Sequence, residues 1–350
     1  MPYEIKKQKV LVTGGAGFIG SNLIDSLLSH DNTVICLDNF STGSIHNLTS
    51  AQKNPKFTLL EGDIRDGEVC KKAVEGCDYV FHQAALGSVP RSIADPITST
   101  EVNILGFVNL LFVAQEAGAK RFIYAASSST YGDHQALPKV EHVIGNSLSP
   151  YAITKYVDEL FAKNFSDIYG IETVGLRYFN VFGRRQDPNG AYAAVIPKFV
   201  SSLLAHKSPY INGDGTNSRD FTYIDNVIQA NQLAAAVPTE LFKERMKEYQ
   251  SNMEGVPEVI EEAAISEVFN VAFGERTSLN ELAEAIKKGL SKYDPAIADI
   301  SFQYGPNRPG DVAHSMASIQ KGKSILGYQP KYSFQTGLKE ACAWYWENLK

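Results

Sequence analysis

The sequence predicts an α/β fold, a doubly wound parallel sheet followed by a smaller α/β C-terminal lobe. Short runs rich in β-branched and aromatic residues recur along the first half of the chain, and stretches with helical spacing, such as Ile97–Gly118 and Pro150–Tyr169, separate most of them. This alternation is typical of strand–helix–strand units, whose right-handed crossovers wind a parallel sheet of the Rossmann type. The predicted strands are Val10–Thr13, Thr33–Asp38, Phe57–Asp63, Tyr79–Gln83, Phe122–Ala126 and Thr173–Tyr178.

The alternation becomes irregular after about residue 185. Gly, Pro and Asn cluster at Gln186–Gly190 and Gly213–Asn217, as they do in loops. We therefore expect residues 1–184 to form the main domain and residues 185–350 to form mainly the smaller lobe, with some later segments returning to the sheet. Pro238–Glu262 is dense in Glu and Lys and is expected to be a solvent-exposed helical excursion, because charge runs are usually solvated.

The composition argues against several classes of protein. Of 350 residues, 44% are hydrophobic and 21% charged, as in ordinary globular proteins. The 33 basic and 39 acidic residues give a net charge of −6, which does not favour a nucleic-acid partner, since that requires a basic face. The cysteines and histidines are too scattered to predict a disulfide framework or a metal site.

The N-terminal segment does not resemble an export signal. Met1–Lys9 is polar and carries three lysines. No segment approaches the roughly 18 uninterrupted apolar residues of a membrane span, so no membrane partner is expected. The sequence therefore predicts a cytoplasmic protein.

A glycine-rich loop, TGGAGFIG (Thr13–Gly20), joins the first predicted strand to the helical stretch Ser21–Ser29. In this position glycines let the backbone approach a pyrophosphate, and the helix N-terminus offers it free N–H groups. The second strand ends in Asp38, which can accept hydrogen bonds from ribose hydroxyls and would repel a 2′-phosphate. The predicted cofactor is therefore NAD rather than NADP. Its expected contacts on these segments are Gly14, Gly17, Phe18, Ile19, Gly20, Asp38, Asn39, Phe40, Ser41, Thr42 and Gly43.

The later strands are expected to complete the cofactor site. Asp63, at the end of the third strand, is placed to meet the adenine edge, although it could instead cap a helix over Arg65–Val74. The other residues expected on the cofactor are Ile64, Gln83, Ala84, Ala85 and Tyr178.

Tyr151 and Lys155 stand four residues apart at the start of a predicted helix, which Ser149 can cap and Pro150 can open. This spacing puts both side chains on one face. A free phenol titrates near 10 and is a poor base at neutral pH, but an adjacent ammonium and a positive nicotinamide ring favour the phenolate. Serines at 127–129 follow a predicted strand, at the end that faces the ligand crevice in such sheets.

Together these motifs resemble the extended short-chain dehydrogenase/reductase family, and within it the UDP-hexose 4-epimerases. The resemblance is greatest to the bacterial UDP-N-acetylglucosamine 4-epimerase subgroup. It covers nearly the whole chain except Pro238–Glu262. Besides the residues above, it rests on FHQAA (Phe81–Ala85), AALGSVPRSIADP (Ala84–Pro96), SPYAITK (Ser149–Lys155), LRYFNVFG (Leu176–Gly183), RRQDPNGAYAAVIPKF (Arg184–Phe199) and RDFTYIDN (Arg219–Asn226).

The resemblance implies a mechanism. Tyr151 takes the proton of the sugar 4-hydroxyl while C4 gives a hydride to NAD⁺, and the 4-keto sugar turns over before the hydride returns to its other face. Lys155 holds the nicotinamide ribose. Ser127, or in an alternative register Ser128, bridges to the sugar O4.

The resemblance also implies how a UDP-sugar substrate is held. Arg219 and Arg308 bind the diphosphate, with Asn180 beside it, and Asp311 accepts from the uridine ribose. The position beside the sugar C2 substituent is Ser315, small enough for an acetamide; it could also cap a helix beginning near Met316. The other expected substrate contacts are Gly87, Ser88, Ser129, Ala194, Val195, Tyr210 and Asn212.

Alternatives stay open at this level. Sugar-nucleotide 4,6-dehydratases place an Asp-Glu pair where this chain has Ser128 and Ser129, so dehydration is not expected. A uronate epimerase or decarboxylase is harder to exclude, because the serine run suits these enzymes too. Arg91 could bind a carboxylate or could equally be a surface arginine beside a helix. A non-catalytic NAD-binding scaffold is a distant third. A homodimer through Ile97–Ala117 and Ser149–Tyr169 is also implied, in which Leu105, Phe112 and Leu160 would face either the partner or the subunit's own core.

Overall fold

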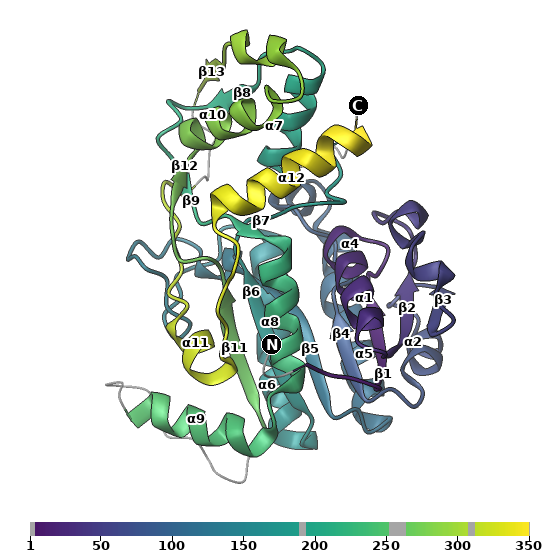
Figure 1. Ribbon diagram of the computed structural model, residues 1–350. Helices are drawn as coiled ribbons and strands as arrows, with labels where there is room; N and C mark the ends of the chain where they lie inside the picture. The colour runs from purple at the N-terminus through teal and green to yellow at the C-terminus, as the bar shows by residue number, and fades with distance from the viewer. Residues whose placement is uncertain (1–3, 189–193, 252–263, 307–311, 350) are drawn as a thin grey trace.

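The computed structural model describes residues 4–188, 194–251, 264–306 and 312–349. Its centre is a seven-stranded sheet with the strand order β11-β6-β5-β4-β1-β2-β3 (Figure 1). All neighbours in this sheet pair in parallel, which confirms the predicted fold class. The strands are β1 (Lys9–Thr13), β2 (Thr33–Asp38), β3 (Phe57–Glu61), β4 (Tyr79–His82), β5 (Arg121–Ser127), β6 (Glu172–Tyr178) and β11 (Ser266–Val271).

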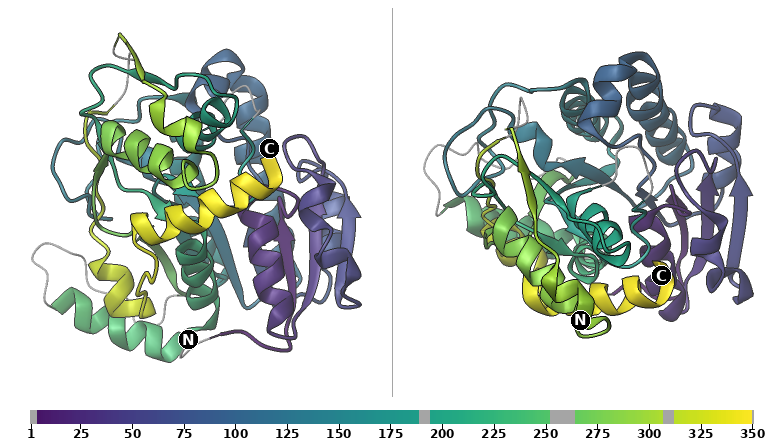
Figure 2. Two further views of the ribbon diagram at one scale, coloured as in Figure 1. Left: turned by 45° about the horizontal axis from the view of Figure 1, so that its top comes forward. Right: turned by 90° about the horizontal axis from the view of Figure 1, so that it is seen from above.

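Helices cover both faces of the sheet and enclose two separate hydrophobic cores (Figures 1 and 2). One core holds the buried residues of α1 (Phe18–Ser29) and α8 (Ile224–Ala236). The other holds those of α2 (Gly67–Val74), α5 (Gly106–Glu116) and α6 (Pro150–Tyr169). The helix predicted from Ser21 begins three residues earlier, at Phe18, and the third strand ends at Glu61 rather than Asp63.

The single helix predicted over Ile97–Gly118 is divided. It consists of α4 (Pro96–Thr100), a π-helical turn (Glu101–Leu105) and α5, running on without a loop. By length and composition alone this run is apolar enough to cross a membrane, contrary to the expectation from the sequence. Core helices of globular proteins can be equally apolar, and 44% of the most apolar part of this run is buried.

The remaining elements lie mostly at the carboxyl end of the sheet (Figures 1 and 2). Of the late segments, β11 joins the main sheet, whereas the short strands pair as β7 with β10, β8 with β13 and β9 with β12. The division into two domains stays a prediction. These elements are α3 (Val89–Ala94), β7 (Val181–Phe182), α7 (Val195–Leu204), β8 (Tyr210–Asn212), β9 (Ser218–Arg219), β10 (Thr222–Tyr223), β12 (Thr277–Ser278), α10 (Leu279–Leu290), β13 (Gln303–Gly305), α11 (Gln320–Leu326) and α12 (Phe334–Leu349). Within the described residues, 3₁₀ helices span Ile45–Leu48, Ala51–Lys53, Ser128–Tyr131 and Pro295–Asp299.

The predicted charged excursion is a helix, α9 (Thr239–Ser251), but it is not wholly solvent-exposed. Phe242 and Met246 are buried on its inner face, and the Phe242 ring lies 5.8 Å from that of Phe269 in β11. The expectation of full exposure is wrong here because one apolar stripe runs through the charged sequence. The rest of the stretch, 252–262, lies outside the described residues.

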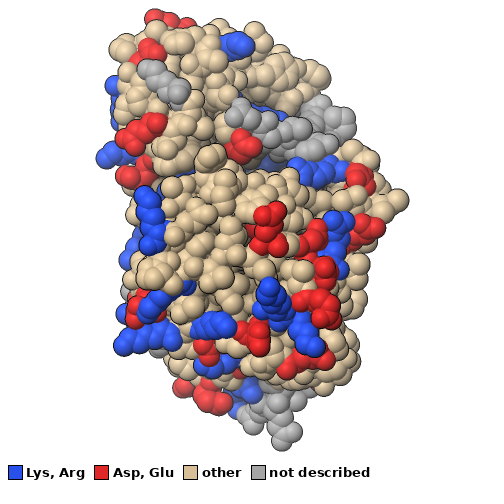
Figure 3. Space-filling view, turned by 90° about the vertical axis from the view of Figure 1, so that its right-hand side faces the viewer, with Lys and Arg blue, Asp and Glu red and all other residues tan. Residues whose placement is uncertain are grey.

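Charge is mixed on the side of the molecule that carries β3 and α2. Lys and Arg alternate there with Asp and Glu, without a large patch of one sign (Figure 3). An anionic ligand at this face would depend on a few local cations.

Candidate active site

A cavity of about 320 Å³ opens where the glycine loop between β1 and α1 meets the segments after β2, β3 and β4. Most of the predicted cofactor residues line it, whereas Phe40, Gly43, Tyr151, Lys155 and Tyr178 do not. Leu37, Gly62, Leu86 and Val102 were not predicted. The predicted residues on its wall are Gly14, Gly17, Phe18, Ile19, Gly20, Asp38, Asn39, Ser41, Thr42, Asp63, Ile64, Gln83, Ala84 and Ala85, together with Gly87 from the substrate set.

The glycine loop is as close-packed as a pyrophosphate cradle requires. Gly14 has φ +65°, and a Cβ there would lie 2.7 Å from the backbone of Ala84. A Cβ on Gly20 would lie 2.2 Å from the carbonyl oxygen of Gly14. No side chain in the described part of the chain caps the start of α1 at Gly17, so the first N–H groups of this helix remain for an anion.

Asp38 is fixed at the end of β2 by both carboxylate oxygens. Oδ2 accepts the backbone N–H of Ala16 and Oδ1 that of Phe40, each at 2.8 Å. Burial raises the pKa of Asp38, while these two hydrogen bonds favour its ionised form. Each oxygen keeps a lone pair, so the carboxylate can still accept from a ribose diol. Gly43, which does not line the cavity, is packed against Ala16.

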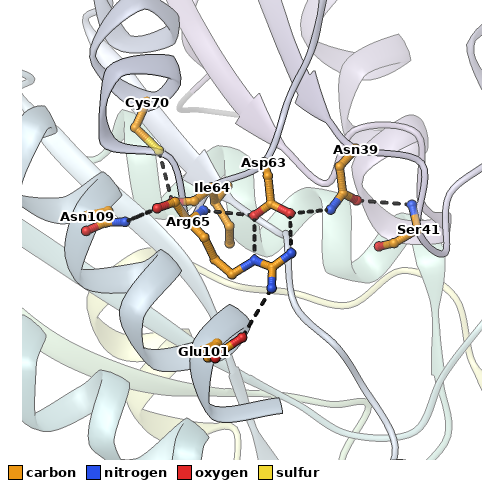
Figure 4. Close-up of polar contacts among 8 residues, drawn as sticks. All are labelled: Asn39, Ser41, Asp63, Ile64, Arg65, Cys70, Glu101 and Asn109. Carbon is orange, nitrogen blue, oxygen red and sulfur yellow. Dashed lines mark hydrogen bonds and ion pairs between the residues drawn. The ribbon is translucent and has the colours of Figure 1, made fainter. Parts of the chain in front are cut away.

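Asp63 lies on the cavity wall with both oxygens engaged (Figure 4). Arg65 donates through its backbone N–H (2.9 Å), Nε (3.0 Å) and one terminal nitrogen (2.8 Å), and Asn39 donates through Nδ2 (2.8 Å). The Arg65 guanidinium lowers the pKa of Asp63 to about 2. The alternative of Asp63 as a helix cap is wrong, because α2 begins at Gly67 and Asp66 caps it.

Tyr151 and Lys155 stand on the first turns of α6, as predicted. The Ser149 hydroxyl caps this helix by accepting the N–H of Ala152 at 3.1 Å, and Pro150 is its first residue. Tyr151 is half-buried, and its backbone N–H donates to the hydroxyl of Ser92 in α3 at 3.0 Å.

The serine run turns sharply at the end of β5, against α6. The Ser127 hydroxyl accepts the N–H (3.2 Å) and the hydroxyl (2.9 Å) of Ser129. Its own proton therefore remains available to a substrate oxygen. Ser128 is half-buried beside it, and the choice between Ser127 and Ser128 stays open.

Asn103, in the π-helical turn, was missed from the sequence. Its side chain accepts the N–H of Leu86 (2.8 Å) and donates to the Leu86 carbonyl (3.2 Å) and to the Thr154 hydroxyl (3.1 Å). It thereby ties the cavity loop after β4 to α6 between Tyr151 and Lys155. The available sequence signal was an asparagine within an otherwise apolar helical stretch. In the structure it lies in a π-helical turn, a feature that often marks functional sites.

Tyr178 lies behind the cavity rather than on it. Its hydroxyl donates to Oε1 of Gln83 at 3.0 Å and accepts from Nδ2 of Asn231 at 2.9 Å. It therefore orients Gln83, which does line the cavity.

The predicted substrate residues on the C-terminal side are joined by hydrogen bonds. The Arg219 guanidinium donates to the carbonyls of Ser218 (3.0 Å) and Ala313 (3.1 Å), and the N–H of Ser315 donates to the Ser218 carbonyl at 3.1 Å. Ser315 is half-buried but caps no helix: α11 begins only at Gln320, so the alternative of a helix from Met316 is wrong.

Asp220 organises this region and was also missed. Its buried carboxylate accepts the N–H groups of Phe273, Gly274 and Ala317 at 3.1–3.3 Å, and its carbonyl accepts Nδ2 of Asn180 at 3.1 Å. It therefore connects the Arg219 strand to the segment carrying Ser315.

The other predicted substrate residues lie on several different elements. Ser88 caps α3 with φ +93°. Ala194 is exposed just before α7, which begins at Val195, while Tyr210 is exposed and Asn212 half-buried in β8. Arg308 and Asp311 lie outside the described residues.

Residues 10–249 match the sequence model of the NAD dependent epimerase/dehydratase family. The chain belongs to this family. A putative UDP-glucose 4-epimerase of Methanocaldococcus jannaschii is 35% identical over 337 residues, 96% of this chain and 97% of that protein.

Solved structures agree with the family assignment. A UDP-N-acetylglucosamine 4-epimerase from Methanobrevibacter ruminantium, in complex with UDP-N-acetylmuramic acid, has 37% identity and a TM-score of 0.84 over 98% of this chain and 99% of that one. A UDP-glucuronic acid 4-epimerase from Bacillus cereus, in complex with UDP-glucuronic acid and NAD, has 28% identity and a TM-score of 0.80 over 97% and 99%. The family description and this complex confirm the predicted cofactor, NAD, and the prediction of an NAD-dependent isomerase of nucleotide-sugar epimerase type.

Proposed function

We propose that this family member is a UDP-N-acetylglucosamine 4-epimerase, which interconverts UDP-GlcNAc and UDP-GalNAc and also acts on UDP-Glc and UDP-Gal. Its products would supply the synthesis of surface polysaccharide. The observation that carries the N-acetyl preference is the placement of Ser315. The backbone N–H of Ser315 is held by the carbonyl of Ser218, next to Arg219. The position of Ser315 relative to Arg219, the cation proposed to bind the diphosphate, is therefore fixed. A small side chain there leaves space for an acetamide.

The proposed mechanism uses the residues of α6 and β5. The glycine loop and Asp38 would hold NAD⁺, which would supply reversible hydride transfer at C4 of the sugar, with return to the opposite face of the 4-keto sugar. Tyr151 removes and later returns the O4 proton, and the Lys155 ammonium would hold the nicotinamide ribose. Ser127 or Ser128 holds O4 by a hydrogen bond, while Arg219 grips the diphosphate and leaves the hexose free to turn.

We also propose that the enzyme is a cytoplasmic homodimer. Leu105, Phe112 and Leu160 are 49%, 41% and 52% exposed, so they do not pack into the subunit's own core. With Ile97, 72% exposed, they leave apolar surface uncovered on adjoining helices. A second copy of the chain would cover it.

A UDP-uronate epimerase or decarboxylase is the second candidate. Arg91 is half-buried on α3, and its backbone N–H donates to the hydroxyl of Ser88 at 3.4 Å, which places it one turn from a proposed sugar contact. From that position a guanidinium would suit a carboxylate.

A competition assay separates these functions. Purified enzyme receives UDP-GlcNAc, UDP-Glc, UDP-glucuronate and UDP-N-acetylglucosaminuronate together, and each product is quantified. The proposal predicts that UDP-GlcNAc is converted fastest and that the uronates are left. Preferential conversion of a uronate would overturn the N-acetyl assignment, and no conversion of any sugar would favour a non-catalytic NAD-binding protein.

A further inference from the structure

Lys155 forms a buried ion pair with Asp158, less than one helical turn further along α6. Nζ of Lys155 lies 3.2 Å from Oδ2 of Asp158, and the two side chains are 2% and 0% exposed. Removing both charges from water is costly, and breaking such a pair leaves one charge uncompensated. The ammonium assigned to the active site is thus charge-balanced by a carboxylate from its own helix.

The carboxylate of Asp158 has little else to bind. Its second oxygen, Oδ1, is buried and accepts no hydrogen bond from the described residues. By contrast, the neighbouring Glu159 is bound through both oxygens by Arg177 of β6, at 2.8 and 2.7 Å. Asp158 therefore interacts chiefly with Lys155, whereas Glu159 belongs to a separate pair.

Titratable groups from the sheet also face this part of α6. His82 of β4 is fully buried, and the Lys155 ammonium helps to lower its pKa to about 3, burial being the larger cause. Tyr124 of β5 is fully buried near Asp158 and Glu159, with Arg177 of β6 and Glu267 of β11 acting on it more weakly. Neither His82 nor Tyr124 supplies a counter-charge to the ammonium at neutral pH.

We propose that Asp158 is a positioning residue that keeps the Lys155 ammonium charged and occupies one of its donors, leaving the other two for the nicotinamide ribose and the Tyr151 oxygen. This rests on the proposed function, in which Tyr151 is the base. An ammonium has three donors, so the three tasks are compatible. Burial raises the pKa of Asp158 to about 7 while the ammonium opposes the rise, so the pair is strongest above neutral pH.

The test compares Asp158→Asn with Glu159→Gln. Asparagine keeps a hydrogen-bond acceptor but removes the charge, so the ammonium loses its proton more readily. We expect the alkaline limb of kcat for UDP-GlcNAc to move to lower pH by about one unit or more. The NAD dissociation constant, measured by titration without sugar, should rise and rise further at alkaline pH. Glu159→Gln should lower thermal stability and leave both readouts unchanged.

A second comparison tests whether Asp158 acts through Lys155. Lys155→Met alone and Lys155→Met with Asp158→Leu both lack the ammonium, and the double variant replaces the pair by apolar groups, which buried sites tolerate. They should bind NAD equally. A further loss in the double variant, or an unshifted alkaline limb with unchanged NAD affinity in Asp158→Asn, would overturn the proposal. A wild type that binds NAD but converts no UDP-sugar would count against the proposed function alone, because the NAD titrations still test Asp158.

Discussion

Nδ1 of His82 lies 2.9 Å from the hydroxyl of Thr13, across the paired ends of β4 and β1. The next residues along the two strands are Gln83 and Gly14, both on the cofactor cavity. This buried hydrogen bond therefore fixes the two strands where they open into the site. The ring's Nε2 has no hydrogen-bond partner among the described residues.

His82 should make the protein less stable in acid. Burial lowers its pKa to about 3, against about 6.5 in the unfolded chain. Below pH 6.5 the unfolded state binds a proton that the folded state does not, so the free energy of unfolding decreases as the pH is lowered. The contribution of the neutral His82 to stability is fully present above pH 6.5. As the pH falls towards 3, the loss of stability approaches about 1.4 kcal/mol per pH unit.

Urea unfolding between about pH 7 and about pH 5 tests this linkage. His82→Asn, which preserves a partner for Thr13, should flatten the pH dependence, whereas replacing the exposed His46 by Asn should not. Equal slopes in wild type and His82→Asn would show that the folded protein accommodates the proton.

Asp38 should decide the cofactor. Its carboxylate would bind the ribose diol of NAD and repel the 2′-phosphate of NADP, so cofactor-free wild type should prefer NAD. Asp38→Ser should weaken NAD binding by about 10- to 100-fold, the loss expected for hydrogen bonds to a charged group, and reduce the preference. The same change at Asp66, which caps α2 outside the cavity, is the control for stability. Equal affinity of wild type for both cofactors would refute this role.

The exposed apolar residues of α5 and α6 should form a dimer interface. A charge at Phe112 would be buried against the partner, so Phe112→Glu should shift the mass measured by light scattering from dimer to monomer. Ile45→Glu changes an equally exposed residue, 40% against 41%, outside these helices and should leave the mass unchanged. A wild type that is monomeric at all concentrations would contradict the proposal.

Ser315 should act as a size gate for the C2 substituent. Ser315→Tyr should lower kcat/KM for UDP-GlcNAc at least about tenfold more than for UDP-Glc, since steric exclusion affects only the larger group. Ser315→Ala keeps the space and should preserve the ratio. Equal losses on the two sugars would remove the main reason for preferring the N-acetylated substrate.

Local sequence signals predicted the elements that hold the cofactor. The runs rich in β-branched and aromatic residues located six strands to within two residues at each end, and Ser149-Pro150 located the start of α6. These succeeded because caps, glycines and periodicity act over a few neighbouring residues. The π-helical turn at Glu101–Leu105 left no such signal, because the apolar pattern continues through it.

The features that were not predicted from the sequence depend on contacts between segments distant in the chain. The hydrogen bond from Asn39 to Asp63, the partners of Asp220 and the inward face of α9 arise only once the strands are assembled. Sequence periodicity carries no information on which side chain meets which across the fold. The same holds for Asp158, whose spacing from Lys155 is common on exposed helices and gains its meaning from burial.

The proposed mechanism requires that the hydrogen on C4 leaves as a hydride and returns to the same carbon. UDP-GlcNAc labelled with deuterium at C4 is incubated with the purified enzyme in ordinary water, and the UDP-GalNAc formed is analysed by NMR and mass spectrometry. We expect the deuterium to be retained, now on the opposite face of C4. Replacement of the label by solvent hydrogen would contradict it, because the hydrogen would then have left as a proton.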